Sequence, residues 1–274
     1  MCKGETELTD RITSRENTKI KDLVKLISSK KARDEACLFV CEGVRLSVDA
    51  MGSGVQIVRV FFSDSAVERY ADAVMSLKNY AEECFLIPDD LAWRVADTRT
   101  TQGVFAVCQK LDNCQTFAKI RKDGNYLLLS LQDPGNLGAI LRTAEAFGLD
   151  GVIMDNECPD LYSPKVLRAS MGGVFRLNLW ITDNLPQAIE SLQKAGIKVF
   201  AAVLREGATL LGDSVFAGGN AVLIGNEGNG LPEAIIRQCD GSMCIPMAGG
   251  AESLNAACAA AVFLWEITKR KRVQ

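Results

Sequence analysis

The stretch Tyr126-Leu127-Leu128-Leu129-Ser130-Leu131-Gln132-Asp133-Pro134-Gly135-Asn136 decides the fold, because an apolar run passes directly into turn residues and the start of a helix. The leucines show no polar alternation, which is typical of a parallel strand buried on both faces. The run Ala221-Val222-Leu223-Ile224 has the same character and also leads into a polar loop. The sequence therefore predicts an α/β domain in which helices cover a parallel sheet.

Strand and helix signals alternate on both sides of these two runs. In this domain, strands are expected at residues 126–131, 151–154, 174–180, 198–203, 221–225 and 243–246, and helices at 136–147, 163–171 and 254–268. Residues 1–110 predict a smaller α/β unit, with strands at 37–41, 56–62 and 103–108 and a short helix at 42–50. The polar residues 111–125 are expected to link this unit to the second domain, residues 126–274.

Composition excludes several classes of protein. With 274 residues, 48% of them hydrophobic and 24% charged, the chain is expected to fold as a globular protein. No apolar run approaches the roughly 18 residues of a membrane span, so we expect a cytoplasmic protein without a membrane partner. The ten cysteines form no CxxC pair, which favours reduced thiols. The absence of histidine excludes Ser-His catalysis and His-dependent zinc chemistry, and we assign no metal site.

Cationic residues concentrate near the N-terminus, although the whole chain has a net charge of −3. Residues 11–33 hold eight Lys or Arg and two acidic residues. Apolar residues at helical spacing predict an amphipathic basic helix over residues 14–31. A solvated helix face is one interpretation of such a charge run, and a polyanionic partner is the other.

Polar clusters follow three of the predicted strands, at the sheet edge where open α/β sheets bind ligands. In the first, Asn136 and Arg142 offer a carboxamide and a cation for a phosphate or polar substrate, or else a helix cap and a surface ion pair. The second, residues 225–233, has glycines that do not fit a dinucleotide-binding fingerprint. In the third, residues 245–255, Ser253 is expected to cap the last helix.

Taken in order, these clusters resemble the motifs of the SpoU, or TrmH-like, family of the SPOUT superfamily, which comprises RNA ribose 2′-O-methyltransferases dependent on S-adenosyl-L-methionine (AdoMet). The resemblance covers about residues 125–268 and rests on Asn136 with Arg142, Gly225-Asn226-Glu227-Gly228, and Ile245-Pro246-Met247 followed by Ser253-Leu254-Asn255. Residues 39–45 and 97–103 are similar to the ribosomal-protein-like α/β module that binds substrate in many members.

The resemblance implies a deep trefoil knot in the parallel-sheet domain and AdoMet as the cofactor, bound in that knot. By position, the cofactor-binding residues are expected to be Leu204, Gly225, Asn226, Gly228, Ile245, Met247 and Leu254. With RNA as the implied partner, the residues assigned to RNA contact are Lys19, Lys25, Lys30, Lys31, Arg33 and Arg45, with support from the Lys269–Arg272 tail. The family is homodimeric, and the Ala-rich segment 254–268 is expected to contribute to the interface.

The resemblance assigns Arg142 as the central catalytic residue, with Asn136, Glu227, Ser253 and Asn255 shaping the site. A guanidinium with a pKa above about 12 is a poor proton acceptor. We therefore expect Arg142 to orient a phosphate or stabilise a developing alkoxide rather than act as a general base.

The implied activity is transfer of a methyl group from AdoMet to a ribose 2′-hydroxyl of RNA. The appended N-terminal unit favours 23S rRNA over tRNA as the substrate. A non-catalytic RNA-binding or ribosome-assembly factor and a methyltransferase acting on a base are the alternatives. The sequence does not identify the modified nucleotide, nor does it separate a housekeeping role from an antibiotic-resistance role.

Overall fold

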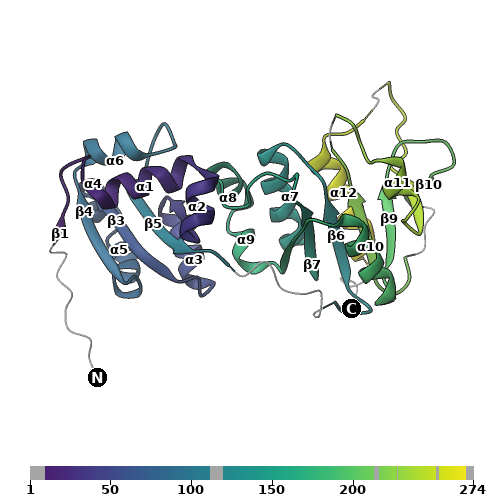
Figure 1. The fold of residues 1–274 in the computed structure, drawn as a ribbon, viewed down its shortest axis with the longest axis horizontal. Helices are drawn as coiled ribbons and strands as arrows, with labels where there is room; N and C mark the ends of the chain where they lie inside the picture. Colours follow the sequence, from purple (N-terminus) through teal and green to yellow (C-terminus); the bar gives the residue numbers. More distant parts are fainter. Residues whose placement is uncertain (1–9, 112–119, 213–215, 227, 251–252, 270–274) are drawn as a thin grey trace. The chain divides into compact units, whose positions relative to one another are not determined.

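The computed structural model describes residues 10–111, 120–212, 216–226, 228–250 and 253–269. The chain divides into two compact units, each of which combines helices with a sheet (Figure 1). Unit 1 comprises Met1–Leu111 and Tyr162–Arg168, and unit 2 comprises Asp112–Leu161 and Ala169–Gln274. The α/β fold class predicted from the sequence is confirmed for both parts.

Unit 1 contains a five-stranded sheet in the order β1-β4-β3-β5-β2, in which β5 is antiparallel to both of its neighbours. The strands are β1 (Asp10–Arg11), β2 (Leu38–Glu42), β3 (Ile57–Ser63), β4 (Glu83–Ile87) and β5 (Val104–Gln109). The helices are α1 (Thr18–Ser28), α2 (Lys30–Ala36), α3 (Val44–Gly52), α4 (Asp64–Arg69), α5 (Ala71–Tyr80) and α6 (Asp89–Val95). The predicted strands are confirmed, whereas α4, α5, β4 and α6 have no counterpart among the predicted elements because such short elements give weak periodicity.

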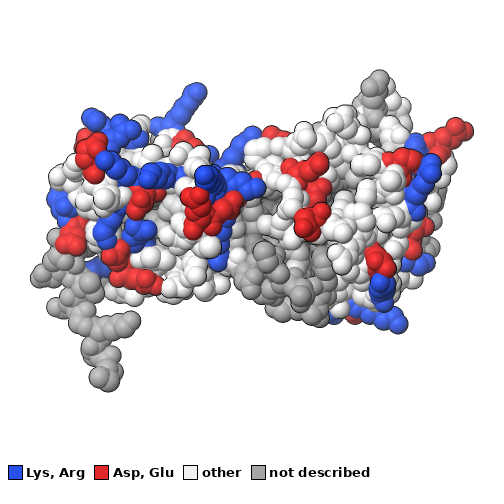
Figure 2. Space-filling model, viewed as in Figure 1, with Lys and Arg blue, Asp and Glu red and all other residues white. Residues whose placement is uncertain are grey.

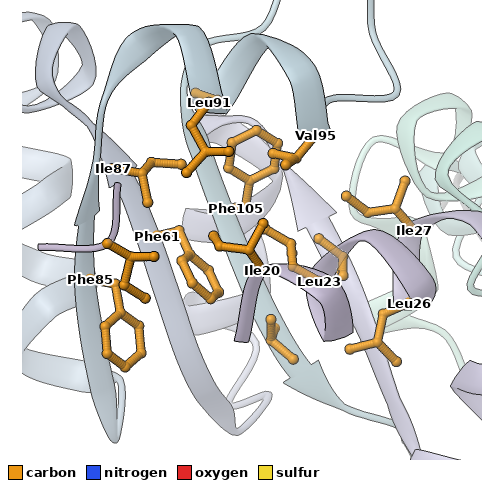
Figure 3. Close-up of a cluster of buried hydrophobic side chains, with 14 residues drawn as sticks. Ile20, Leu23, Leu26, Ile27, Phe61, Phe85, Ile87, Leu91, Val95 and Phe105 are labelled. Atoms are coloured by element: carbon orange, nitrogen blue, oxygen red, sulfur yellow. The ribbon is translucent and has the colours of Figure 1, made fainter. Parts of the chain in front are cut away.

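Helix α1 packs its apolar stripe on the sheet beside α6 (Figure 3). Ile20, Leu23 and Ile27 recur at helical spacing and lie against Phe61 and Phe105 of the strands. Leu91 and Val95 of α6 close the same cluster. Burial of this stripe leaves Lys21 and Lys25 exposed, whereas Lys19 is half-buried with its ammonium 4.3 Å from the centroid of the Phe85 ring.

The predicted basic helix over residues 14–31 is broken at Ser29. This residue has an extended backbone, with φ −125° and ψ 118°, and its hydroxyl accepts a hydrogen bond from the Ala32 amide at 3.3 Å. Because serine side chains compete for backbone amides, they favour helix caps over helix interiors. The single helix is therefore corrected to α1 and α2, which begin and end on either side of this cap.

Unit 2 contains a seven-stranded, all-parallel sheet in the order β10-β12-β9-β11-β6-β7-β8. The strands are β6 (Asn125–Leu129), β7 (Gly151–Asp155), β8 (Leu179–Thr182), β9 (Lys198–Ala202), β10 (Thr209–Leu210), β11 (Asn220–Ile224) and β12 (Gly241–Cys244). The helices are α7 (Pro134–Ala146), α8 (Pro164–Ser170, which begins in unit 1), α9 (Gly173–Arg176), α10 (Leu185–Lys194), α11 (Glu233–Ile236) and α12 (Ala256–Thr268). The two continuously apolar runs form β6 and β11, which pair with each other and are buried throughout.

One strand prediction in unit 2 is wrong at its start. Residues 174–176 lie in the short helix α9, and the strand β8 begins only at Leu179. Gly172 precedes α9 with φ 79°, a left-handed conformation that glycine adopts without strain. An added Cβ at Gly173 would lie 3.2 Å from the Leu141 carbonyl, so α9 packs closely on α7.

The trefoil knot that the family resemblance implies for this domain stays a prediction.

A segment from the second half of the sequence belongs to unit 1. The Tyr162 ring stacks on Phe39 with centroids 4.7 Å apart, and its hydroxyl accepts a hydrogen bond from the Leu111 amide at 3.0 Å. Arg168 donates to Asp97 at 2.7 Å. The sequence predicted two contiguous domains joined at residues 111–125, and it did not predict that residues 162–168 belong to the first of them.

Among the described residues, every helix is too short or too polar to span a bilayer.

Candidate active site

A pocket of about 450 Å³ lies at the carboxyl ends of β9, β11 and β12. This volume is within the range of small-molecule sites. The loops after these strands and the start of α12 form its walls. Of the predicted site residues, those lining it are Leu204, Gly225, Asn226, Ile245, Met247, Ser253, Leu254 and Asn255. Three segments far apart in the sequence thus meet at one edge of the sheet; two of them contain the second and third polar clusters, whereas no residue of the first cluster lines the pocket.

The pocket is mainly apolar, and apolar side chains also stand at its rim. Leu204 and Leu254 are 63% and 40% exposed, which is costly for leucine unless a ligand covers it. Met243 and Phe263 contribute to the wall from β12 and α12. No described residue that lines the pocket is ionisable apart from Cys244. The chemistry of this lining fits a ligand that presents an apolar ring system.

The loop after β11 folds back on itself beside the pocket. The Gly230 amide donates to the Asn226 carbonyl at 2.9 Å, and the Asn226 side chain accepts from the Gly228 amide at 2.7 Å. A Cβ at Gly225 would lie 2.6 Å from Leu231 Cγ and 2.8 Å from the Gly230 carbonyl. Only glycine permits this close approach, so Gly225 has a structural reason. Glu227, within the same loop, lies outside the described residues.

Asn136 and Asn255 meet across the site. Asn255 donates from Nδ2 to Oδ1 of Asn136 at 2.9 Å, which joins the start of α12 to the first turn of α7. The other side of the Asn255 carboxamide accepts from the amides of Ala257 and Cys258 at 2.9 and 3.3 Å. Asn255 is therefore the N-cap of α12, and the prediction that Ser253 caps this helix is wrong. Ser253 instead lies exposed at the pocket.

Helix α7 begins at Pro134, two residues earlier than expected. Asp133 is its N-cap, and the Asp133 carboxylate accepts from the Asn136 amide at 2.7 Å. Asn136 is therefore not the N-cap of α7, and its side chain accepts a hydrogen bond from Asn255 instead. The dipeptide Asp133-Pro134 carried the signal, since aspartate at the N-cap and proline at the first helical position are both favoured.

A buried thiol supports the chain where it leaves β6 for α7. Cys158 Sγ donates to the Leu129 carbonyl at 3.3 Å and accepts from the Leu131 amide at 3.5 Å. Burial raises the pKa of Cys158 to about 12, so the thiol is neutral and unreactive. Its role here is to satisfy two backbone groups that precede the motif carrying Asn136.

Arg142 lies exposed on α7, and it is not among the residues that line the pocket. Within the described part of the chain it forms no ion pair, whereas Gly173 of α9 would place a Cβ 3.5 Å from the Arg142 Cα. The backbone at Arg142 is thus held by α9 while its guanidinium is available to a ligand. Gly228, predicted to contact the cofactor, is likewise exposed and outside the pocket lining.

The structure divides the residues predicted to bind RNA. Figure 2 shows Lys and Arg over unit 1 along α1 and α2, with acidic side chains among them. Lys19 pairs with Glu83 at 2.7 Å and Lys31 with Glu35 at 3.7 Å. The remaining exposed candidates have no ion pair with any described residue; they are Lys25, Lys30 and Arg45.

The prediction that Arg33 contacts RNA is corrected, because the Arg33 side chain is buried. It is only 4% exposed, and Nη1 donates to the carbonyls of Leu26 and Ile27 at 2.6 and 3.0 Å. These carbonyls lie in the last turn of α1, where a cation is favoured by the helix dipole. Arg33 therefore joins α1 to α2, and it is not available to RNA.

Comparison with known proteins matches both parts of the chain. Residues 125–265 match the model of the SpoU rRNA methylase family, and residues 17–106 match the MRM3-like substrate binding domain. The 23S rRNA (guanosine(2553)-2′-O)-methyltransferase RlmP of Bacillus subtilis is 32% identical, over 94% of this chain and 98% of that protein. The 23S rRNA (uridine(2479)-2′-O)-methyltransferase of Streptomyces viridochromogenes is 31% identical, over 97% and 94%.

A solved structure agrees with these matches. The AdoMet-bound rRNA methyltransferase of Sinorhizobium meliloti superposes with a TM-score of 0.82 at 28% identity, over 95% of this chain and 98% of that one. The match of the family model spans the strands and loops that build the pocket, and the relatives match over nearly their whole length. This chain belongs to the SpoU rRNA methylase family.

Proposed function

We propose that this protein transfers a methyl group from AdoMet to a ribose 2′-hydroxyl of 23S rRNA. The observation that carries the proposal is the pocket in which the loops after β9, β11 and β12 meet, because it gathers most of the residues expected to hold the cofactor. The AdoMet-bound relative of the same fold and the two 23S rRNA 2′-O-methyltransferases support it.

The residues present fit AdoMet. Leu204, Leu254 and Phe263 offer apolar surface to an adenine ring, and the backbone of the Gly225 loop offers peptide groups to polar edges. When bound, AdoMet supplies an electrophilic methyl group on a sulfonium centre. The chain itself must orient the ribose and stabilise charge on its oxygen.

Three polar residues divide that work. The hydrogen bond from Asn255 to Asn136 fixes the edge of the pocket against α7. Arg142, further along α7, supplies a cation that orients a backbone phosphate or stabilises the alkoxide as the proton leaves. A guanidinium remains protonated at neutral pH, so it serves as an electrostatic group rather than as the base.

The same proposal includes a homodimer in the cytoplasm. Support for the dimer comes from α12, on which Val262 and Trp265 are 40% and 54% exposed. Trp265 contacts Phe147 edge-on, at 6.0 Å between centroids, so its ring is held in place at the surface. Exposed apolar side chains on a fixed helix are suited to an interface between subunits.

Transfer of labelled methyl groups from AdoMet to unmodified 23S rRNA and to unmodified bulk tRNA, presented separately, tests the proposal. We expect label in the 23S rRNA, and digestion to nucleosides should place it on a ribose. Label confined to tRNA would overturn the choice of substrate, label on a base would overturn the reaction, and AdoMet binding without transfer to either RNA would favour an RNA-binding factor.

A further inference from the structure

The loop between α6 and β5, residues 97–103, is held in place by a buried carboxylate. Glu42, at the end of β2, is 8% exposed. It accepts hydrogen bonds from the Asp97 amide at 2.9 Å, from the Thr98 amide at 3.4 Å and from the Thr98 hydroxyl. No described cation pairs with Glu42, so these donors alone compensate its desolvation. A buried charge satisfied only by one loop is a strong constraint on the position of that loop.

The other end of the loop is bonded to the residues that follow Glu42, at the start of α3. Gln102 accepts from the Val44 amide at 2.9 Å, where α3 begins. Gly43, just before Val44, has φ 103°, a backbone conformation that favours glycine. Arg168 adds an ion pair to Asp97 at 2.7 Å. The loop is thus fixed at both ends although it has no regular secondary structure.

Two cations are presented by this scaffold. Arg99 lies at the middle of the loop and Arg45 in the first turn of α3, next to the residue that bonds Gln102. Both are exposed, and within the described part of the chain neither has an ion-pair partner. Arg11 and Lys19, by contrast, pair with carboxylates at 2.6 and 2.7 Å. An ordered loop that carries an unpaired arginine is suited to a polyanion, since little side-chain and loop entropy remains to be lost on binding.

We propose that Arg45 and Arg99 form a phosphate-contact site for the substrate RNA and that Glu42 is the positioning residue that holds it in place. The inference rests on the proposed function and names a surface of unit 1 that meets the RNA backbone. Each of these guanidinium groups can engage a phosphate in bidentate geometry, which a lysine ammonium does not provide.

The test measures affinity for unmodified 23S rRNA by filter binding, together with kcat and KM for methyl transfer. Arg45→Gln and Arg99→Gln should each weaken RNA affinity about tenfold and reduce the salt dependence of binding by about one contact. KM for RNA should rise with kcat nearly unchanged, and AdoMet affinity should not change. The matched control is Lys78→Gln in the last turn of α5, where the Lys78 carbonyl accepts from Cys84 of β4; it should leave RNA affinity unaltered.

A double-mutant cycle separates positioning from simple stability. Glu42→Ala should weaken RNA affinity as much as Arg99→Gln, and adding Arg99→Gln to it should cost little more, because the released loop no longer presents the guanidinium. If Arg99→Gln lowers affinity by the same factor in both backgrounds, Glu42 does not position it. Should Glu42→Ala fail to fold, Glu42→Gln, which keeps one acceptor oxygen for Asp97, takes its place in the cycle.

The outcomes distinguish this inference from the proposed function. Wild-type protein that methylates 23S rRNA, with both arginine variants retaining wild-type affinity and salt dependence, overturns the phosphate-contact site and leaves the proposed function standing. Wild-type protein that binds the RNA but transfers no methyl group contradicts the proposed function, while the variant affinities still decide the site. Absence of any RNA binding overturns both.

Discussion

Asn255 does the work of two residues at the edge of the pocket. Its oxygen caps α12 through the amides of Ala257 and Cys258, and its nitrogen donates to Asn136. Aspartate would keep the cap and lose the donor, and serine would cap without reaching across. The residue type is therefore set by two separate demands, one on stability and one on the site.

Substitutions at Asn255 should separate these demands. Asn255→Ala should lower the free energy of unfolding by about 1 kcal/mol, because the cap is lost, and should also reduce methyl transfer. Asn255→Ser should restore stability but not activity, because the bond to Asn136 is still missing. Calorimetric unfolding and labelled transfer provide the measurements. Full activity in the serine variant would contradict a role for that bond.

Arg142 should tolerate a change of shape better than loss of charge. Arg142→Lys should retain measurable transfer, whereas Arg142→Gln should lower kcat by about 100-fold or more, as expected for a group that stabilises developing charge. Neither change should alter thermal stability, since the side chain is exposed. If the lysine variant is as inactive as the glutamine variant, the guanidinium geometry itself is required.

At the scale of elements, two cations of α2 have separate roles, one buried against α1 and one exposed. Arg33→Gln should destabilise unit 1 by about 2 kcal/mol, because buried carbonyls of Leu26 and Ile27 lose a charged donor. Lys30→Gln, its exposed neighbour, should leave urea unfolding unchanged and weaken RNA binding. The reverse pattern would restore Arg33 to the RNA surface.

Two loops of unit 2 hold thiols that should resist alkylation, Cys158 after β7 and Cys239 before β12. Burial raises the pKa of Cys158 to about 12 and that of Cys239 to about 11, so both remain protonated, and therefore weak nucleophiles, from pH 6 to pH 9. Cys37 and Cys258 are exposed. Peptide mass spectrometry after brief iodoacetamide treatment at pH 8 should find Cys37 and Cys258 modified well before Cys158. Rapid modification of Cys158 would mean that β6 and β7 open readily.

At the scale of the whole molecule, α12 provides the test of assembly. Trp265→Glu places a charge where an apolar ring is 54% exposed, so it should shift the protein from dimer to monomer in light scattering while leaving AdoMet affinity in place. Lys194→Gln on α10 is the control, because it also lowers the net charge by one. A monomeric wild-type protein would contradict the proposed dimer.

The sequence predicted the central strands well and the segment boundaries less well. Unbroken apolar runs identify β6 and β11 because burial on both faces leaves no other pattern. The cap of α7 shifted to Asp133, since neighbouring polar residues compete for one position and only the folded chain decides among them. Val203, Met243 and Phe263 were missed as pocket walls, because nothing local distinguishes them from core residues.

Long-range contacts are the least predictable part. The ring of Tyr162 on Phe39 joins residues more than a hundred positions apart, and no periodicity encodes such a pair. The motif glycines, by contrast, form a pattern that is visible in the sequence, although the contacts around them are not. At Gly225 the contacts are the close approaches of Gly230 and Leu231.

Because residues 162–168 belong to unit 1, recombination between related genes at the boundary near residues 112–125 would not exchange whole units. A crossover within residues 112–125 would give the N-terminal unit a foreign partner and replace the tyrosine and arginine that meet Phe39 and Asp97. Recombinant chimeras joined there should inherit mismatched surfaces unless the 162–168 segment travels with the N-terminal half. The exchangeable cassette in this lineage is therefore discontinuous in the gene, even though it is continuous in space.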